Sequence, residues 1–341
     1  MAIEQGPVPQ HTPTPAGDPR AVSAEEILKN LQHTIGGAVV GYDHLVRYLV
    51  IALVSGGHVL LEGVPGLAKT YLVRTFSKTL DLEFRRIQFT PDMLPSDIMG
   101  VVALNPHSQS FEFRPGPIFA NVILADEINR APPKVQSALL EAMQERQVTV
   151  EGHSYPLPDP FIVIATENPV EQEGTYPLPE AELDRFLFRL IVEYPSEDAE
   201  FQLLNQRASE AVIEPTQSTV DRQEILALQE ERKSVHVGRD VLQYLTNIVR
   251  GTRKDPRILV GASPRAGVQF LSAAKSFAMF EGRNYVTPDD VRSLVMPVLN
   301  HRLILSAEIL AMHQSEGSQI DGGQIYQRAI QGVIDKVPVP R

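Results

Sequence analysis

A glycine-bearing loop between an apolar run and a helical stretch is the feature that most constrains how this chain can fold. The loop is Gly63-Val-Pro-Gly-Leu-Ala-Lys-Thr70; the run His58-Val-Leu-Leu61 precedes it, and residues 71–80 carry a helical pattern. In a strand–loop–helix context, glycines let backbone N–H groups turn inward on phosphate oxygens, next to the positive end of the helix dipole. The loop therefore predicts a site for a nucleoside triphosphate.

The positions of this loop have distinct expected roles. Lys69 would bridge the β- and γ-phosphates, and the hydroxyl of Thr70 would hold Mg²⁺. The remaining positions that we expect to line the nucleotide are Gly63, Val64, Pro65, Gly66, Leu67, Ala68 and Tyr71.

One loop position departs from the general pattern. Ala68 stands where the expression G-x-x-x-x-G-K-[ST] has its second glycine. Alanine is the smallest change available, and it is tolerated where φ is negative. We therefore interpret the loop as a working variant, on the condition that Ala68 has a negative φ.

Two adjacent acids end the apolar run Val122-Ile-Leu-Ala125. Ligands of open α/β sheets bind at the carboxyl ends of strands, which is where Asp126 and Glu127 would lie. Asp126 would hold Mg²⁺ or its water ligand, and Glu127 would act as general base on the attacking water. The alternative, a strand ending in a solvated acidic turn, is disfavoured by the phosphate loop that precedes it.

A further apolar run, Phe161–Ala165, delivers Thr166-Glu-Asn-Pro169 to the same predicted edge. Asn168 could orient the water between Glu127 and the γ-phosphate. An asparagine before proline is also a common turn former, so the functional interpretation depends on the preceding motifs.

The apolar runs alternate with helical stretches, which indicates an α/β fold with a parallel sheet flanked by helices. After Pro195 the helical patterns take over, and a smaller all-helical domain is expected. A chain of 341 residues is long enough for a core in each domain. The expected units are a disordered proline-rich tail, an α/β nucleotide-binding domain, the helical domain and a C-terminal tail, at residues 1–22, 23–195, 196–332 and 333–341.

Charge and cysteine content exclude several function classes. The formal net charge of −11 disfavours nonspecific nucleic-acid binding, which depends on Lys and Arg. The absence of cysteine excludes disulfides, thiolate metal sites and a cysteine nucleophile, and it fits a reducing compartment, so a cytoplasmic location is expected. No apolar run approaches the roughly 20 residues of a membrane-spanning helix.

Taken together, the motifs resemble those of AAA+ ATPases of the MoxR family. The segments that carry the resemblance are G-V-P-G-L-A-K-T at 63–70, A-D-E-I-N-R at 125–130, A-T-E-N-P at 165–169 and L-P-E-A-E-L-D-R-F at 178–186. The resemblance covers residues 40–270 and implies a P-loop NTPase (AAA+) core, a helical lid domain, and ATP and Mg²⁺ as cofactors. It also implies that Val40 and Gly41 lie on the adenine side of the nucleotide.

The resemblance implies roles for two arginines. Arg185 would be an arginine finger that reaches the γ-phosphate held by a neighbouring subunit, although a salt bridge with a nearby acid is the simpler interpretation from sequence alone. Arg265 would be the sensor 2 arginine, contacting the γ-phosphate of its own subunit. Ser263 and Pro264 signal a helix start, where a cation is disfavoured unless an anion lies nearby.

Two stretches, Asp97–Pro117 and Thr149–Pro160, resemble the hairpin inserts that face the ring pore or the partner in related machines. The implied function is that of an ATP-driven ring of identical chains, expected to be a hexamer, which remodels or activates a protein partner as a chaperone does. Partners of the family include proteins with a von Willebrand factor A domain, and its roles include maturation of, or metal insertion into, enzyme complexes.

Two other function classes stay open at this point. A nucleic-acid motor is one, because helicase relatives share the hairpin inserts, but the acidic charge disfavours it. A nucleotide-dependent scaffold with little turnover is the other, and the presence of both Glu127 and Asn168 disfavours it.

Overall fold

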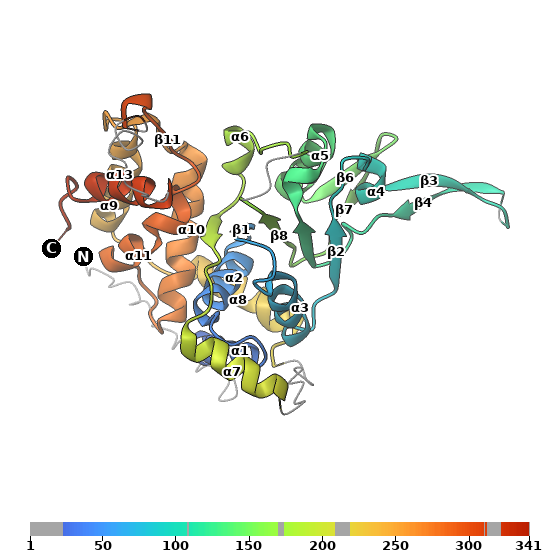
Figure 1. The fold of residues 1–341 in the computed structure, drawn as a ribbon, viewed down its shortest axis with the longest axis horizontal. Helices are drawn as coiled ribbons and strands as arrows, with labels where there is room; N and C mark the ends of the chain where they lie inside the picture. The colour runs from blue at the N-terminus through green and yellow to red at the C-terminus, as the bar shows by residue number, and fades with distance from the viewer. Residues whose placement is uncertain are drawn as a thin grey trace, which may run out of the picture.

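The computed structural model describes residues 23–107, 109–169, 174–208, 219–309, 311 and 322–340. At its centre is a parallel five-stranded sheet with the order β2-β5-β8-β1-β9 (Figure 1). In chain order the strands are β1 (Val59–Glu62), β2 (Phe84–Gln88), β5 (Val122–Asp126), β8 (Ile162–Glu167) and β9 (Phe188–Ile191). The predicted α/β class is confirmed. The mostly polar strand β2, at one edge of the sheet, was not predicted, because it has no apolar run.

Two hydrophobic clusters lie on opposite faces of this sheet. Val122 and Leu124 of β5 belong to one cluster, and Ile123 and Ala125 belong to the other. This alternation follows from the two-residue period of side chains along a strand. The described residues form two cores, but the sheet separates them, and one of the cores includes side chains of the C-terminal helices. The expected division into one core per domain was wrong.

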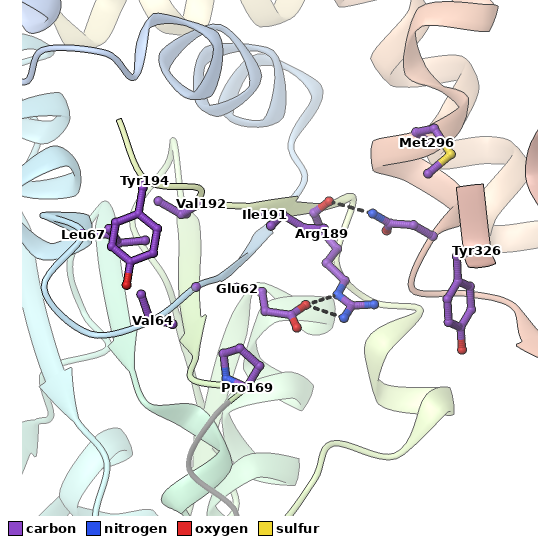
Figure 2. Close-up of a pocket in the computed structure, with 12 residues that line it drawn as sticks. Glu62, Val64, Leu67, Pro169, Arg189, Ile191, Val192, Tyr194, Met296 and Tyr326 are labelled. Atoms are coloured by element: carbon purple, nitrogen blue, oxygen red, sulfur yellow. Dashed lines mark hydrogen bonds and ion pairs between the residues drawn. The ribbon is translucent and has the colours of Figure 1, made fainter. Parts of the chain in front are cut away.

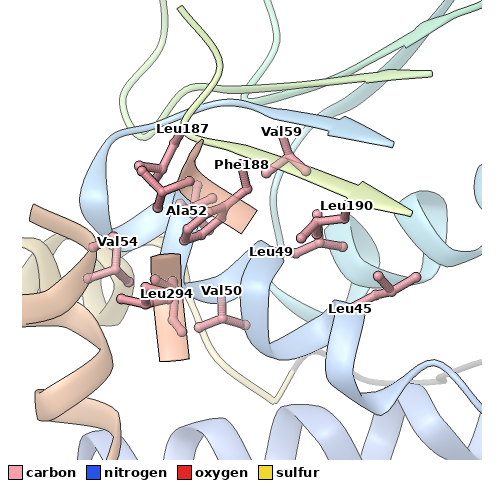
Figure 3. Packing of buried hydrophobic residues seen from close by; sticks show 14 of the residues in the cluster. Leu45, Leu49, Val50, Ala52, Val54, Val59, Leu187, Phe188, Leu190 and Leu294 are labelled. Carbon is pink, nitrogen blue, oxygen red and sulfur yellow. The ribbon is translucent and has the colours of Figure 1, made fainter. Parts of the chain in front are cut away.

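One face of the sheet is covered by α1 (Ala24–Ala38), α2 (Asp43–Ser55) and α3 (Lys69–Thr79). Figure 3 shows Leu49 and Ala52 of α2 beside Phe188 of β9, with Leu294 of the C-terminal helices in the same cluster. Burial of such side chains contributes about 1.5–3 kcal/mol each, so α2 is fixed against both the sheet and the C-terminal helices.

The opposite face of the sheet is covered by α4 (Pro95–Met99), η1 (Ile128–Arg130) and α5 (Pro133–Glu145). The two predicted inserts are antiparallel hairpins, β3 (Gly100–Asn105) with β4 (Ser110–Pro115) and β6 (Gln147–Val150) with β7 (His153–Pro156). Phe113 and Tyr155 stack with ring centroids 3.9 Å apart, so the hairpins contact each other. The β3–β4 hairpin extends far from the body of the molecule (Figure 1).

The C-terminal region, here called the lid, follows the short helix α6 (Glu180–Leu183) and strand β9. Its helices are α7 (Glu197–Ala208), α8 (Arg222–Ser234), α9 (Arg239–Thr252), α10 (Pro264–Phe280), α11 (Pro288–Leu299) and α13 (Gly322–Ile334). It is not all-helical, because β10 (Ile258–Val260) and β11 (Ile304–Leu305) pair antiparallel. These strands are too short to give a sequence pattern.

The lid is bound to α2 by polar contacts as well as by the shared core. Ser55 Oγ lies 2.8 Å from Ser276 Oγ, and Gln229 Nε2 donates to the Leu53 carbonyl at 2.9 Å. At the other end of the lid, Val333 and Ile334 of α13 are buried, so the predicted C-terminal tail begins later than residue 333.

The predicted proline-rich tail, residues 1–22, lies outside the described residues. Among the helices of the described ranges, none combines the length and the apolarity that crossing a membrane requires.

Candidate nucleotide site

The phosphate loop connects the end of β1 to the start of α3, as its sequence predicts. Gly66 in the turn has a φ of +89°, a conformation that favours glycine. Lys69 Nζ donates to the Gly63 carbonyl oxygen at 2.5 Å. Burial lowers the pKa of Lys69, while the charges of Asp126 and Glu127 oppose that shift. The loop therefore folds around its own ammonium group and holds it partly desolvated, next to two carboxylates.

Ala68 does not have the negative φ that its tolerance was expected to require. Its φ and ψ are +54° and 20°, in the left-handed region, and it is the N-cap residue of α3. The expectation was wrong: the loop keeps the backbone conformation of a glycine at a position that holds alanine. A left-handed non-glycine residue costs about 1–2 kcal/mol, so the loop carries local strain beside the phosphate position.

Asp126 and Thr70 face each other at the carboxyl edge of the sheet. Thr70 Oγ1 donates to Asp126 Oδ2 at 3.4 Å, and Arg86 Nε of β2 donates to the same oxygen at 2.9 Å. Asp126 Oδ1 accepts from Thr166 Oγ1 at 2.6 Å. A hydroxyl and a carboxylate are hard oxygen ligands, so the pair of Thr70 and Asp126 fits the expected Mg²⁺.

Glu127 is held in a defined position beside Asp126. Its φ of +58° is uncommon for a non-glycine residue and is a conformation found at functional sites. Its backbone N–H donates to Thr166 Oγ1 at 2.9 Å. Its carboxylate accepts from Gln88 Nε2 at 2.7 Å and pairs with Arg130 Nε at 3.0 Å. Both the backbone and the carboxylate of Glu127 are therefore oriented by neighbouring side chains.

Sequence reasoning missed four polar side chains of this site. Arg130 lies inside the A-D-E-I-N-R motif, which was singled out for its acids. Thr166 lies inside the A-T-E-N-P motif, which was singled out for its asparagine. Arg86 and Gln88 lie on β2, and only the pairing of β2 with β5, with Gln88 opposite Asp126, brings them to the acids. The motifs could have indicated Arg130 and Thr166, whereas no local signal marks the other two.

A cavity of about 350 Å³ gathers the predicted catalytic groups except Arg185. It is lined by Pro65, Gly66, Leu67, Ala68, Lys69, Thr70, Tyr71, Asp126, Glu127, Thr166 and Asn168. Asn168 is buried at the end of β8, close to the two acids. The geometry thus places an ammonium, a hydroxyl, two carboxylates and an amide around one space.

A second cavity, of about 430 Å³, lies on the other side of Ala68 and Tyr71. The predicted adenine-side residue Val40 lines it, and Gly41 has a φ of +90°. A Cβ on Gly41 would lie 3.1 Å from the Ala199 Cβ, so α7 packs closely on this segment. The sequence did not indicate the apolar residues that the segment after β9 and helix α7 add to this cavity: Tyr194, Pro195, Ala199, Leu203 and Leu204.

A third cavity, of about 490 Å³, lies behind the loop, between β9 and the lid (Figure 2). Arg189 Nε donates to Glu62 Oε2 at 2.6 Å, and the Arg189 carbonyl accepts from Asn300 of the lid at 3.2 Å. The pKa of the neighbouring Glu167 is raised, first by burial and then by the charge of Glu62. Gly63, Val64 and Leu67, which were predicted to line the nucleotide, line this cavity, whereas none of the predicted catalytic side chains does. The cavity therefore borders the phosphate loop on the side away from the catalytic groups.

Arg185 lies at the opposite edge of the sheet. It precedes β9, and Leu187 N–H donates to the carbonyl of His58, the residue before β1, at 2.8 Å. The phosphate loop follows the last residue of β1, and four residues of strand span about 13 Å. Arg185 is therefore remote from the phosphate loop of its own chain.

Arg265 does not contact its own nucleotide site. It is the second residue of α10, donates to Gln144 Oε1 at 3.3 Å, and lines a cavity with Asp184 and Arg302 on the same side as Arg185. The prediction that Arg265 contacts the γ-phosphate of its own subunit was therefore wrong. The lid packs so that α10 starts beside α6, at the amino edge of the sheet.

Comparisons with known proteins agree with this architecture. Residues 58–188 match the model of the ATPase family associated with various cellular activities, and residues 250–321 match that of the AAA lid domain. The chain is 45% identical to the uncharacterized protein YeaC of Bacillus subtilis, over 92% of this chain and 95% of that protein. It is 42% identical to the chaperone MoxR1 of Mycobacterium tuberculosis, over 89% of this chain and 82% of that protein.

A solved structure shows the same fold. A putative ATPase from Cytophaga hutchinsonii superposes with a TM-score of 0.83 at 41% identity, covering 93% of this chain and 96% of that one. Protein MoxR of Methylorubrum extorquens is 31% identical over 95% of this chain and 98% of its own length. With the phosphate loop, the paired acids and the lid in place, the chain belongs to the MoxR family of AAA+ ATPases.

Proposed function

We propose that this chain works as a ring of identical subunits in which Arg185 of one subunit completes the ATP site of the next. The observation that carries the proposal is the position of Arg185 and Arg265 at the sheet edge opposite the phosphate loop. Neither arginine serves the nucleotide of its own chain from there.

Each predicted residue has a distinct part in hydrolysis. Lys69 binds the β- and γ-phosphates, Glu127 takes a proton from the attacking water, and Asn168 orients that water. Thr166 fixes the rotamer of Asp126 and the backbone of Glu127. Mg²⁺, held by Thr70 and Asp126, would neutralise phosphate charge. Arg185, and beside it Arg265, would stabilise the charge of the transition state from the neighbouring subunit.

The base of ATP would occupy the cavity that Val40 lines. Its walls are largely apolar, which suits a planar ring, and they include Tyr71 and Leu203. Because α7 contributes part of the wall, the base would contact both α7 and the Val40-Gly41 segment on which α7 packs.

The work of the ring would be to remodel or activate a protein partner. One relative is named a chaperone, which supports this class of function. The β3–β4 hairpin exposes Phe111, Leu104 and Val101 at 74%, 53% and 42%, and these apolar side chains would contact the partner. The family resemblance makes proteins with a von Willebrand factor A domain, enzyme-complex maturation and metal insertion the candidates, in the cytoplasm.

A dilution experiment tests the shared site. ATPase activity per chain and assembled mass are measured together across a concentration series that takes the ring to monomers. We expect activity per chain to fall as the assembly dissociates, while ATP binding to each chain persists. Activity per chain that stays constant down to the monomer would exclude an arginine finger in trans.

A further inference from the structure

The backbone that carries Arg185 is held from the lid. The carbonyl groups of four consecutive residues, 184–187, each accept a hydrogen bond from a lid side chain. Arg302 donates to the carbonyls of Asp184 at 3.3 Å, Phe186 at 2.5 Å and Leu187 at 3.4 Å, and Gln269 donates to that of Arg185 at 3.4 Å.

The N–H groups of the same segment are bound on the other side. Leu187 N–H donates to the His58 carbonyl at 2.8 Å, and Arg185 N–H donates to the Glu182 carbonyl at 3.1 Å. Residues 184–187 therefore form a strip with its N–H groups on the nucleotide-binding domain and its carbonyls on the lid. A displacement of the lid relative to the sheet would pull on this strip directly.

Arg302 is the centre of the contact. Its side chain is 1% exposed, its Nη1 also donates to the Val298 carbonyl at 2.6 Å, and its Nε lies 3.1 Å from Asp184 Oδ1. It also binds the side-chain oxygen of Gln269. Burying a guanidinium is costly, and an apolar residue would fill the same volume at lower cost. The hydrogen bonds to the carbonyls offset part of this cost, and an apolar residue could not make them.

Two further lid residues, His301 and Ser263, bind the same segment. His301 Nε2 lies 2.9 Å from the Phe186 carbonyl, and the Ser263 hydroxyl contacts the Asp184 carboxylate at 2.8 Å. Ser263 is also the N-cap of α10, two residues before Arg265. The two arginines at the amino edge are thus fixed relative to each other through Asp184.

We propose that Arg302 is a positioning residue for the arginine finger: it fixes the backbone at Arg185 to the lid, so that the orientation of the lid in one subunit sets hydrolysis in the next. This inference rests on the proposed role of Arg185 in trans. Arg302 touches no nucleotide. Its effect would appear in turnover and leave ATP binding unchanged.

The test uses the full-length assembled protein and two substitutions. Arg302→Lys keeps the charge but loses the fork of donors that reaches several carbonyls. Gln269→Met keeps the volume of the side chain and removes the contact to the Arg185 carbonyl. If Arg302→Lys does not fold, kcat and KM of Gln269→Met are compared with those of the wild type instead. We expect kcat to fall about tenfold or more, with KM for ATP unchanged, because a misplacement of about 1 Å is sufficient for such a loss.

Arg257→Lys is the matched control. Arg257 is a lid arginine that pairs with Asp255 and donates to the Ala329 carbonyl at 3.4 Å, with all three groups inside the lid. Its substitution should lower thermal stability without a selective loss of kcat. An equal loss of kcat in Arg257→Lys and Arg302→Lys would overturn the positioning role.

Mixing separates this inference from the proposed function. Glu127→Gln subunits lack the base but keep an intact finger segment, so they should restore hydrolysis at Arg302→Lys sites beside them. In an equimolar mixture, half of the chains are Arg302→Lys and have the base. Half of these chains lie beside a Glu127→Gln subunit with an intact finger segment. The expected activity per chain is therefore about a quarter of the wild-type value. Restoration of Arg185→Ala but not of Arg302→Lys would overturn the positioning role alone. Restoration of neither would overturn the finger in trans as well.

Discussion

The two edges of the central sheet are built in different ways. At the carboxyl edge, the phosphate loop and the ends of β5 and β8 supply short motifs whose side chains are oriented by their immediate neighbours. At the amino edge, Arg185, Arg265 and Arg302 come from segments far apart in the sequence, and lid side chains bind the Arg185 backbone. The phosphate loop and the acids of the carboxyl edge thus lie within one domain, and the amino edge depends on how the lid packs.

This difference suggests that the carboxyl edge serves nucleotide binding and the amino edge serves coupling between subunits. A site whose phosphate-binding and acidic groups lie on contiguous motifs of rigid strands can hold the triphosphate in every subunit, while α7 of the lid adds only to the cavity for the base. Because lid side chains bind the backbone at Arg185, a change in the position of the lid would move this arginine relative to the ATP site of the next subunit. Substitutions at each edge can separate the two properties.

The largest expected effect is at the amino edge. Arg185→Ala should lower kcat by about 10³–10⁵ in the assembled protein, because a cation that stabilises the transition state is lost, while ATP affinity is retained. Steady-state kinetics and nucleotide binding by fluorescence measure the two quantities. Arg222→Ala, which removes a surface arginine bound to the Asp159 carbonyl at 2.6 Å, is the control and should leave kcat unchanged.

The next effect is at the carboxyl edge. Glu127→Gln should lower the rate of phosphate release by about 10²–10⁴, because the amide cannot accept the proton, and ATP should remain bound. Phosphate release and retained nucleotide are measured on the same sample. Glu141→Gln on the exposed surface of α5 serves as control, and an unchanged rate in Glu127→Gln would remove the assignment of the base.

A smaller effect concerns His58 at the amino edge, whose burial makes the free energy of unfolding depend on pH. His58 Nδ1 accepts from the Val163 N–H at 3.0 Å, its Nε2 lies 3.1 Å from the Met143 carbonyl, and burial lowers its pKa from 6.5 to about 3. Because the folded pKa lies below the unfolded one, the unfolded state binds the extra proton, and stability is lost as pH falls below 6.5. The expected loss is about 2 kcal/mol between pH 7 and pH 5 from this residue.

Urea unfolding of the wild type and of His58→Gln, at pH 7 and pH 5, measures this contribution. Glutamine can accept and donate in place of the ring but does not titrate. The pKa of the buried His301 is lowered by the same cause, so part of the pH dependence should remain in the variant. An identical pH dependence in the two proteins would contradict the assignment to His58.

The smallest effect is in the phosphate loop. Ala68→Gly should raise the free energy of unfolding by about 1 kcal/mol or less, since glycine adopts the left-handed conformation without strain but is more flexible when unfolded. Thermal unfolding measures the shift. Ala131→Gly is the control with the opposite expected sign, because Ala131 is buried and has a φ of −72°. A loss of stability in both variants would show that Ala68 is not strained.

Local patterns were sufficient for most of the carboxyl edge. Strands β1, β5 and β8 were predicted because each is a continuous apolar run buried on both faces. Lys69, Asp126 and Asn168 were predicted because each directly follows such a run or the glycine loop, and the carboxyl ends of parallel strands meet at one edge. Strand β2 was missed because its polar residues carry no such signal.

The amino edge could not be predicted in the same way. The sequence marked Arg185 and Arg265 through a family resemblance, but it placed Arg265 on the wrong side of the sheet, and it gave no indication of Arg302. Whether the lid reaches one edge or the other depends on how α10 packs against α2 and how α2 and α11 pack against β9. That packing is a sum of many weak contacts between distant segments, and no motif encodes it.

The sequence by itself determined the candidates for the chemistry of this protein: the side chains proposed to bind phosphate, the carboxylate proposed to accept the proton, and the sheet that carries them. These properties follow from residues that are neighbours along the chain, where spacing and strand or helix period fix the geometry. The tertiary structure alone decided the left-handed conformation of Ala68, the approach of Arg86 and Gln88 to the acids, and the side from which the lid holds the finger. Those features depend on contacts between segments that meet only after the chain has folded.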